Sequence, residues 1–373
     1  MKLFINILRV LVGLLFIFSG LVKANDPLGL SFKMQEFFEI WGLHSLNDIA
    51  LPMAVLLNAF EIIAGAALLV RWQFRVTGWL LLILILFFTA LTGYTYFTGM
   101  PKNCGCFGDC LPISSKVSFL KDLVLTVLII FLLWKRNFIS APASPRLTNI
   151  AMWISVAISL GLQWMALTYL PPVDCLPYKK GSDIALNRLT PKDAIPDSIE
   201  IIFTYRKNGR EVHFSASNFP ADFSAEYQFV KREDKLIREG WHKDPPIKGF
   251  VLNTLQGDDS TDQILQKPFT VLVFAEKGQA LMQQQRVIQR LRALTLSKGI
   301  PVYIISSEPS VVENWLPTIG IKGMTVFSCD LKAIQTAARV NPCIYVLEKG
   351  VVKEKVSIRQ VDKIWELIES ANP

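Results

Sequence analysis

Residues 77–134 read TGWLLLILILFFTALTGYTYFTGMPKNCGCFGDCLPISSKVSFLKDLVLTVLIIFLLW, and this stretch decides the fold. It contains two apolar segments, 77–96 and 117–134, each close to the roughly 20 residues that a helix needs to cross a bilayer. Between them lies Asn-Cys-Gly-Cys-Phe-Gly-Asp-Cys at residues 103–110. The stretch predicts a hairpin of two transmembrane helices whose connecting loop carries three cysteines: Cys104, Cys106 and Cys110.

Three further apolar segments, at residues 3–22, 49–70 and 150–170, meet the same length test. The chain is 51% hydrophobic, with a mean hydropathy of +0.36, and the apolar excess lies before residue 171. No Ala-x-Ala cleavage site follows the first segment, so we interpret it as a retained helix. The sequence therefore predicts an all-α membrane bundle, with a four-helix domain over 1–136 and a cytoplasmic loop and fifth transmembrane helix over 137–171.

Basic residues in the short connections set the predicted orientation. Arg71 and Arg75 fill the second-to-third connection, and Lys135, Arg136 and Arg146 fill the fourth-to-fifth. By the positive-inside rule, the N-terminus is cytoplasmic and everything after the fifth helix lies outside. For a bacterial chain this predicts a multi-pass inner (plasma) membrane protein whose six cysteines all face the oxidising periplasm.

The charge of the chain is concentrated beside the membrane. Residues 1–170 carry 12 Lys/Arg against 7 Asp/Glu, a net of +5, and residues 171–373 carry 27 against 24, a net of +3. We interpret this basicity as loop charge next to the lipid bilayer. Basic blocks with interleaved aromatic residues are absent, so the sequence predicts no nucleic-acid partner.

The region after the last apolar segment has the mixed pattern of soluble domains, and Pro171-Pro172 marks its start. Residues 172–245 predict a small strand-rich periplasmic connector, because two short β-forming runs flank the hairpin-turn pair Asn208-Gly209. From residue 246 onward, strand and helix signals alternate. The expected strands are 269–274, 302–305, 343–347 and 351–356, and the expected helices are 279–296 and 361–370.

The order of these elements over 246–373 resembles the thioredoxin fold, so we expect a soluble α/β thioredoxin-like domain. Asn341-Pro342, directly before Cys343, resembles the cis-proline position of that fold. Residues 275–279, where a redox-active member carries Cys-x-x-Cys, contain no cysteine. A binding or spacing role is therefore favoured over a catalytic one. For Cys329 and Cys343, buried apolar packing is the favoured interpretation.

The membrane part resembles a known family. Residues 9–23, RVLVGLLFIFSGLVK, together with Glu61 and Gly65, resemble the DoxX-like family of small four-helix membrane proteins. The loop Cys104-Gly105-Cys106-Phe107-Gly108 is similar to the MauE branch, named for methylamine utilisation. That resemblance, over about residues 1–136, implies a role in maturing disulfides of a periplasmic dehydrogenase. The combined layout resembles a DoxX-containing group from Bacteroidetes.

Thiol chemistry can also be argued from the cysteines themselves. A relay needs one cysteine pair that meets a substrate and another that meets an electron acceptor, and Cys104, Cys106, Cys110 and Cys175 would provide two pairs. A Cys104–Cys106 bond would close a small, strained ring and be comparatively oxidising. Cys106 with Cys110, and Cys110 with Cys175, are equally open pairings. By analogy with membrane bundles that form disulfides, a quinone is the implied acceptor.

Ionisable residues inside the bilayer are functional candidates. Glu61 lies midway along the second apolar segment, and Arg9, two turns into the first, is its expected partner. The alternatives are a structural ion pair or an Arg9 that snorkels to the cytoplasmic surface. Lys121-Asp122 lies just after the cysteine loop, where Lys121 would favour a nearby thiolate or anchor the helix at the interface.

Three hypotheses follow. The first is a thiol–disulfide oxidoreductase or disulfide-maturation factor acting on a periplasmic client protein. The second is a non-enzymatic membrane scaffold whose thioredoxin-like domain binds a partner, and the third is a DoxX-type subunit of a quinone-linked oxidoreductase. No metal is predicted, because the loop has no nearby histidine and the chain's three histidines are isolated: His44, His213 and His242.

Overall fold

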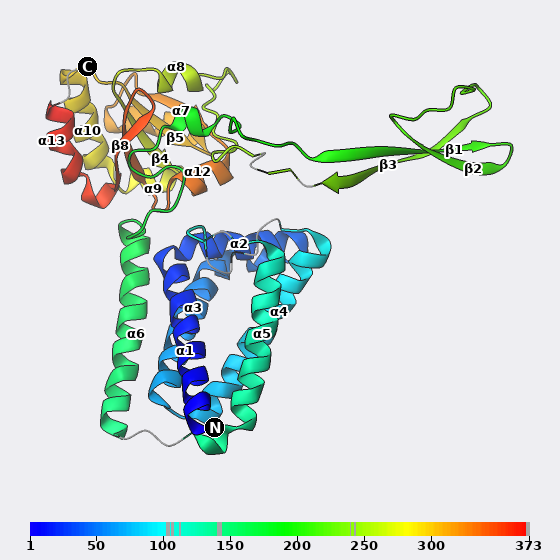
Figure 1. The fold of residues 1–373 in the computed structure, drawn as a ribbon. Helices are drawn as coiled ribbons and strands as arrows, with labels where there is room; N and C mark the ends of the chain where they lie inside the picture. The colour runs from blue at the N-terminus through cyan, green and yellow to red at the C-terminus, as the bar shows by residue number, and fades with distance from the viewer. Residues whose placement is uncertain are drawn as a thin grey trace.

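The computed structural model describes residues 1–101, 105, 108–111, 113–139, 144–238, 240–241 and 244–370. A helical bundle forms one end of the molecule, an α/β domain lies against the other end of that bundle, and a long β-ribbon extends sideways from the α/β domain (Figure 1). Cys104, Cys106 and His242 lie outside the described residues.

Five long apolar helices build the bundle and confirm the predicted membrane segments. Four of the five helices are longer than the predicted segments, and α3 is one residue shorter. Their bounds are α1 (Lys2–Asn25), α3 (Ala50–Val70), α4 (Phe74–Thr98), α5 (Ser115–Trp134) and α6 (Pro145–Thr168).

The helices α1 and α3 run antiparallel in close contact because small residues face each other. A Cβ atom added to Gly65 would lie 2.7 Å from the carbonyl oxygen of Gly13. Glycine at this crossing therefore lets the two backbones approach, as is common between membrane helices. This contact fixes which residues of α1 and α3 are neighbours.

One helix of the bundle was not predicted. The connection between α1 and α3 contains α2 (Pro27–Ile40) and a short 3-10 helix, η1 (His44–Ile49). Asp26 caps α2 by accepting a hydrogen bond from the Gly29 nitrogen at 3.0 Å, and Pro27 follows at the first helical position. As Figure 1 shows, α2 lies across the end of the bundle that faces the α/β domain.

The α/β domain has a five-stranded sheet in the order β6-β5-β4-β7-β8, which confirms the thioredoxin-like fold. The central strand β4 is parallel to β5 and antiparallel to β7. The peptide bond before Pro342 is cis, as predicted. The strand bounds are β4 (Thr270–Ala275), β5 (Val302–Ser306), β6 (Thr325–Ser328), β7 (Cys343–Glu348) and β8 (Val351–Ser357).

Helices cover both faces of this sheet. On one face, Ile288 of α10 and Ile364 of α13 pack against Val273 of β4. On the other, Ile334 of α12 packs with Phe274. Successive side chains of β4 point to opposite faces of the sheet and therefore pack into two different apolar cores. The helices of the domain are α8 (Thr261–Leu265), α9 (Gly278–Met282), α10 (Gln285–Ser297), α11 (Pro309–Trp315), η3 (Leu316–Ile319), α12 (Leu331–Ala337), η4 (Ile358–Gln360) and α13 (Asp362–Ser370).

The predicted connector divides into two parts. Its first part packs on the α/β domain: Tyr178 and Ile184 are in that domain's core, and α7 (Ile184–Asn187) lies beside β8. Its second part is a separate three-stranded sheet in the order β2-β1-β3. Asn208 and Gly209 form the predicted turn with φ angles of 51° and 77°. The strands are β1 (Ser198–Lys207), β2 (Arg210–Ser215) and β3 (Gln228–Arg238).

Candidate functional site

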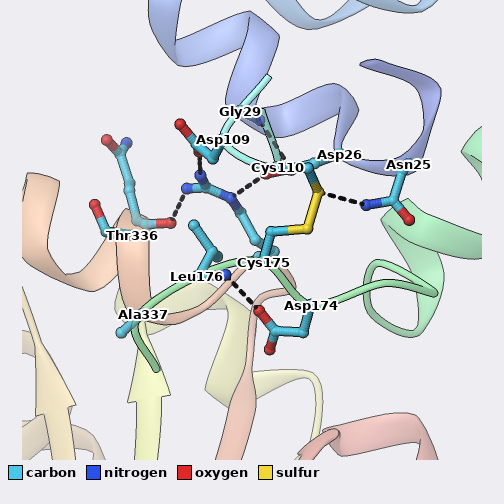
Figure 2. Close-up of polar contacts among 12 residues, drawn as sticks. Asn25, Asp26, Gly29, Asp109, Cys110, Asp174, Cys175, Leu176, Thr336 and Ala337 are labelled. Carbon is cyan, nitrogen blue, oxygen red and sulfur yellow. Dashed lines mark hydrogen bonds and ion pairs between the residues drawn. A yellow bond between two sulfur atoms is a disulfide. The ribbon is translucent and has the colours of Figure 1, made fainter. Parts of the chain in front are cut away.

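A disulfide joins Cys110, in the loop between α4 and α5, to Cys175, seven residues after the end of α6. The Cα atoms are 4.9 Å apart, within the usual range for disulfides. Of the pairings that the sequence left open, the structure therefore contains Cys110 with Cys175. This bond connects the membrane hairpin to the segment that leads into the α/β domain (Figure 2).

Asn25, at the end of α1, contacts both sides of this link. Its Nδ2 atom donates to the carbonyl oxygen of Val173 at 2.8 Å, and its Oδ1 atom accepts from the Val173 nitrogen at 2.9 Å. The same Nδ2 atom lies 3.8 Å from Cys110 Sγ (Figure 2). Asn25 thus holds the chain beside Cys175 and places an amide donor next to Cys110.

Arg339 connects the α/β domain to the membrane bundle. Its side chain is only 5% exposed, and it donates to Asp26 Oδ2 at 2.7 Å and to Asp109 Oδ2 at 2.6 Å. Its remaining guanidinium nitrogen donates to the carbonyl oxygen of Gln335 at 2.6 Å. Asp26 and Asp109 directly adjoin Asn25 and Cys110 in the chain, so Arg339 fixes the surroundings of the disulfide. No sequence pattern indicated this residue, because its partners lie 313 and 230 positions away.

Two more contacts hold the domains together near the same place. The buried Lys355 of β8 pairs with Asp174 at 2.9 Å, and the Ser357 hydroxyl donates to the carbonyl oxygen of Thr168 at 3.0 Å. Asp174 precedes Cys175, so each cysteine of the disulfide is next to an aspartate that pairs with a cation of the α/β domain. The junction therefore contains polar contacts in addition to the disulfide.

The predicted Arg9–Glu61 pair is wrong. Glu61 forms a buried ion pair with Lys23, and Arg9 donates to the carbonyl oxygens of Leu68 and, at 2.8 Å, Leu69. The antiparallel register of α1 and α3 explains this, because it brings Arg9 to the end of α3, where the helix carbonyls attract a cation. It brings Glu61 instead to the C-terminal end of α1, where Lys23 lies.

A small cavity of about 30 Å³ lies between α1, α3, α4 and α5, with Lys23, Glu61, Lys121 and Asp122 in its lining. Glu61 Oε2 is buried and accepts no hydrogen bond in the described structure. Asp122 is fully buried, accepts from the Thr92 hydroxyl at 3.1 Å and pairs with Lys121 at 2.9 Å. The structure thus brings three of the four predicted intramembrane residues together and separates Arg9 from them.

A hydrogen-bond network occupies the place in the thioredoxin-like domain where redox-active members carry Cys-x-x-Cys. The Glu276 nitrogen donates to Asn341 Oδ1 at 3.2 Å, and Gln335 Nε2 donates to Glu276 Oε1 at 3.0 Å. This network ties the loop after β4 to the cis-proline segment and to α12. The network consists of backbone, amide and carboxylate groups.

The two cysteines of this domain are unbonded and buried. Burial raises the pKa of the Cys343 thiol to about 12 and that of the Cys329 thiol to about 11. Thiols with such high pKa values are almost fully protonated at neutral pH and react slowly. Both side chains belong to the apolar core beneath the sheet, in agreement with the packing interpretation.

A cleft of about 770 Å³ separates α2 of the membrane domain from α12 and the loop after β4. Its lining includes Cys175, Lys33 of α2, and Glu276 and Lys277 of that loop. A Cβ atom on Gly105 would lie 3.0 Å from Lys33 Cγ, so the cysteine loop also reaches the α2 side of this cleft. Within the described part of the chain, no group of three or more His, Cys, Asp or Glu side chains could hold a metal ion.

The fold and this site define a multi-pass membrane protein with a helical bundle, a C-terminal thioredoxin-like domain and a disulfide where the two meet. Residues 1–135 match the family model described as methylamine utilisation protein MauE, in agreement with the resemblance of the cysteine loop. Residues 199–239, which cover most of the β-ribbon, match a domain of unknown function, DUF8463.

Comparison with solved structures finds yeast Sco1, at 17% identity and a TM-score of 0.26, covering 33% of this chain and 94% of that chain. Copper-bound yeast Sco1 gives 16% identity and a TM-score of 0.25, covering 33% of this chain and 92% of that one. No curated relative matches the chain. The thioredoxin-like assignment therefore rests on the strand order and the cis-proline.

Proposed function

We propose that this protein is an inner-membrane thiol–disulfide oxidoreductase, or disulfide-maturation factor, that oxidises thiols of periplasmic client proteins. The observation that carries this proposal is the Cys110–Cys175 disulfide, which lies at the junction of a MauE-like membrane domain and a thioredoxin-like domain. Cys175 lines a cleft large enough for a ligand, since binding sites commonly measure about 300–1,000 Å³. The disulfide is therefore placed where a client can reach it.

The proposed reaction is thiol–disulfide exchange. A client thiolate attacks one sulfur of the Cys110–Cys175 bond, and the other sulfur leaves as a thiolate. A second client thiol then resolves the mixed disulfide, so the client is oxidised and the pair is reduced by two electrons. The Arg339–Asp26 ion pair and the Ser357–Thr168 hydrogen bond join the domains without either cysteine, which favours a pair that opens without loss of the site.

Cys104 and Cys106 are the proposed second pair, which takes these electrons and passes them with two protons to a quinone in the bilayer. Support comes from Gly105, which separates them in the sequence and lies against Lys33 at the cleft. The intramembrane cavity supports proton exchange rather than binding of a quinone ring, because about 30 Å³ suits a water molecule. Lys23 and Glu61 are its proposed proton-exchange groups.

The outer domain is the proposed recruitment surface for the client. It carries no dithiol in the loop after β4, but this loop lines the same cleft as Cys175. A domain of this kind contributes binding and orientation, while the sulfur chemistry takes place at the membrane domain's disulfide.

Differential thiol labelling of the periplasmic proteins tests this function. Cells with the Cys110→Ser or Cys175→Ser variant are expected to accumulate reduced thiols in a defined set of proteins, whereas cells with Cys329→Ser are expected to match the wild type. Cys329 is the matched control because it is buried and unbonded. Unchanged client thiols in both disulfide variants, at normal protein abundance, would refute the proposal.

A second candidate function is a membrane scaffold in which the disulfide only stabilises the docked domains. The ion pairs on both sides of the disulfide favour it, because such contacts support a junction with one fixed arrangement. The scaffold predicts that Cys110→Ser lowers the stability or abundance of the protein and leaves electron flow to quinone unchanged. The oxidoreductase hypothesis predicts that Cys110→Ser leaves the stability and abundance of the protein nearly unchanged and lowers electron flow to quinone.

A further inference from the structure

The two sulfur atoms of the disulfide have different surroundings. Cys175 lines the cleft between α2 and α12 and also a more open cavity of about 660 Å³ that Leu186 and Pro246 help to line. Cys110 is not among the described residues that line either space. A thiolate that arrives through the cleft therefore meets Cys175.

The amide of Asn25 distinguishes the sulfurs further. Because Val173 donates to Asn25 Oδ1 and accepts from Nδ2, the orientation of this amide is fixed by the backbone. The atom 3.8 Å from Cys110 Sγ is therefore the donor Nδ2. A donor at this place stabilises Cys110 more strongly when it carries negative charge, because hydrogen bonds to ionised groups are the stronger ones.

We propose that an extended, cysteine-bearing segment of a client protein binds in the cleft and attacks Cys175, with Cys110 as the leaving group; this rests on the proposed function. The bond between the client sulfur and Cys175 Sγ forms as the Cys110–Cys175 bond breaks, and the electron pair stays on Cys110 Sγ. A second client thiol then displaces Cys175. Asn25 acts as a positioning residue that stabilises the leaving thiolate.

The lining of the cleft favours a peptide over a lipid as its occupant. The α2 wall carries Lys33 and Glu36, and the opposite wall carries Glu276, Lys277 and Lys332. Each wall carries positively and negatively charged side chains, which suit the mixed polar surface of a protein segment. An acyl chain instead requires an apolar groove. Cys175 lines the same cleft, so a segment bound there lies next to one end of the disulfide.

Mapping of the mixed disulfide tests the direction of attack. The purified full-length protein, with its disulfide intact, is treated with a synthetic hexapeptide that contains one Cys, one Lys and one Glu, then quenched with acid and N-ethylmaleimide. Peptide mapping is expected to find the hexapeptide on Cys175 and maleimide on Cys110, in at least about tenfold excess over the opposite arrangement. Equal labelling, or an excess of hexapeptide on Cys110, overturns the proposal.

Asn25→Asp tests the positioning role, since aspartate still accepts from Val173 but donates to neither Val173 nor Cys110. Loss of one hydrogen bond to a charged sulfur corresponds to about a tenfold slower exchange. In the reduced protein the same variant is expected to shift the pH profile of Cys110 alkylation upward. An unchanged profile and unchanged exchange rate in a folded variant contradict the role.

Lys277→Glu tests the cleft. It is expected to change the rate of exchange with the hexapeptide. The rate with 2-mercaptoethanesulfonate should stay unaltered once it is corrected for net charge with a Lys322→Glu control, because Lys322 is exposed and lies outside the cleft. Equal effects on both thiols overturn the cleft as the peptide site. Mapping of the mixed disulfide measures which sulfur reacts, whereas thiol labelling in cells measures whether clients are oxidised. The inference and the proposed function can therefore fail separately.

Discussion

Replacing Arg339 by methionine removes the central contact between the two domains. Arg339 makes two charge-assisted hydrogen bonds, to Asp26 at 2.7 Å and to Asp109 at 2.6 Å. A buried bond of this kind contributes about 1.5–3 kcal/mol. Asp109 is 43% exposed, so its share is discounted to roughly 0.5–1 kcal/mol for solvent screening. Arg339→Met is therefore expected to cost about 2–4 kcal/mol of docking free energy.

Hydrogen exchange of the backbone amides of α12 (Leu331–Ala337), in the detergent-solubilised full chain, measures this cost as a lower free energy of opening. Lys332→Met is the matched control on the same surface, because Lys332 lies 3.8 Å from Glu39 and both side chains are well exposed, at 77% and 47%. Its expected effect is below about 0.5 kcal/mol. If Arg339→Met changes exchange no more than Lys332→Met, the reasoning that Arg339 holds the domains together is wrong.

Three further predictions concern burial. Lys23→Met leaves Glu61 charged and unpaired, so the thermal stability of the bundle should fall by roughly 3 kcal/mol, and pairing it with Glu61→Leu should restore part of this loss in a thermal unfolding assay. Burial raises the pKa of the Cys343 thiol to about 12, so the stability that this protonated thiol contributes is present below about pH 9 and is lost as the pH rises toward 12. In urea unfolding between pH 9 and 11, the free energy of unfolding should therefore fall less steeply with pH for Cys343→Ala than for the wild type. Equal slopes of stability against pH would contradict this. Gly65→Ala places a Cβ atom 2.7 Å from a backbone oxygen and should destabilise the bundle by about 1–3 kcal/mol, whereas Gly161→Ala, with no atom within 4 Å, should not, as thermal unfolding of both variants would show.

The membrane helices and the outer fold were predictable because their signals are local. Apolar length marks a transmembrane helix, and alternating strand and helix patterns followed by Asn341-Pro342 mark a thioredoxin-like domain. The turn at Asn208-Gly209 was equally plain, since two positive φ angles require such residues. Each of these features depends on residues that adjoin in the sequence.

The site was predictable only in part, because its contacts join distant segments. The cysteine spacing identified the candidates, yet left the pairing of Cys110 open until the fold brought Cys175 beside it. Arg339 belongs to no recognisable sequence motif, so nothing in the sequence marked it as a site residue. The partner of Glu61 was mispredicted because the choice between Arg9 and Lys23 depends on the register of α1 against α3, which the glycines set and hydropathy does not reveal.

The redox state of Cys110 and Cys175 in living cells tests the central claim most directly. Acid trapping followed by mass-tag alkylation, with and without quinone in the membrane, reports whether this pair cycles. The proposed function predicts a partly reduced pair that becomes mostly reduced when quinone is depleted. A pair that stays fully oxidised under both conditions contradicts it and identifies the Cys110–Cys175 disulfide as purely structural.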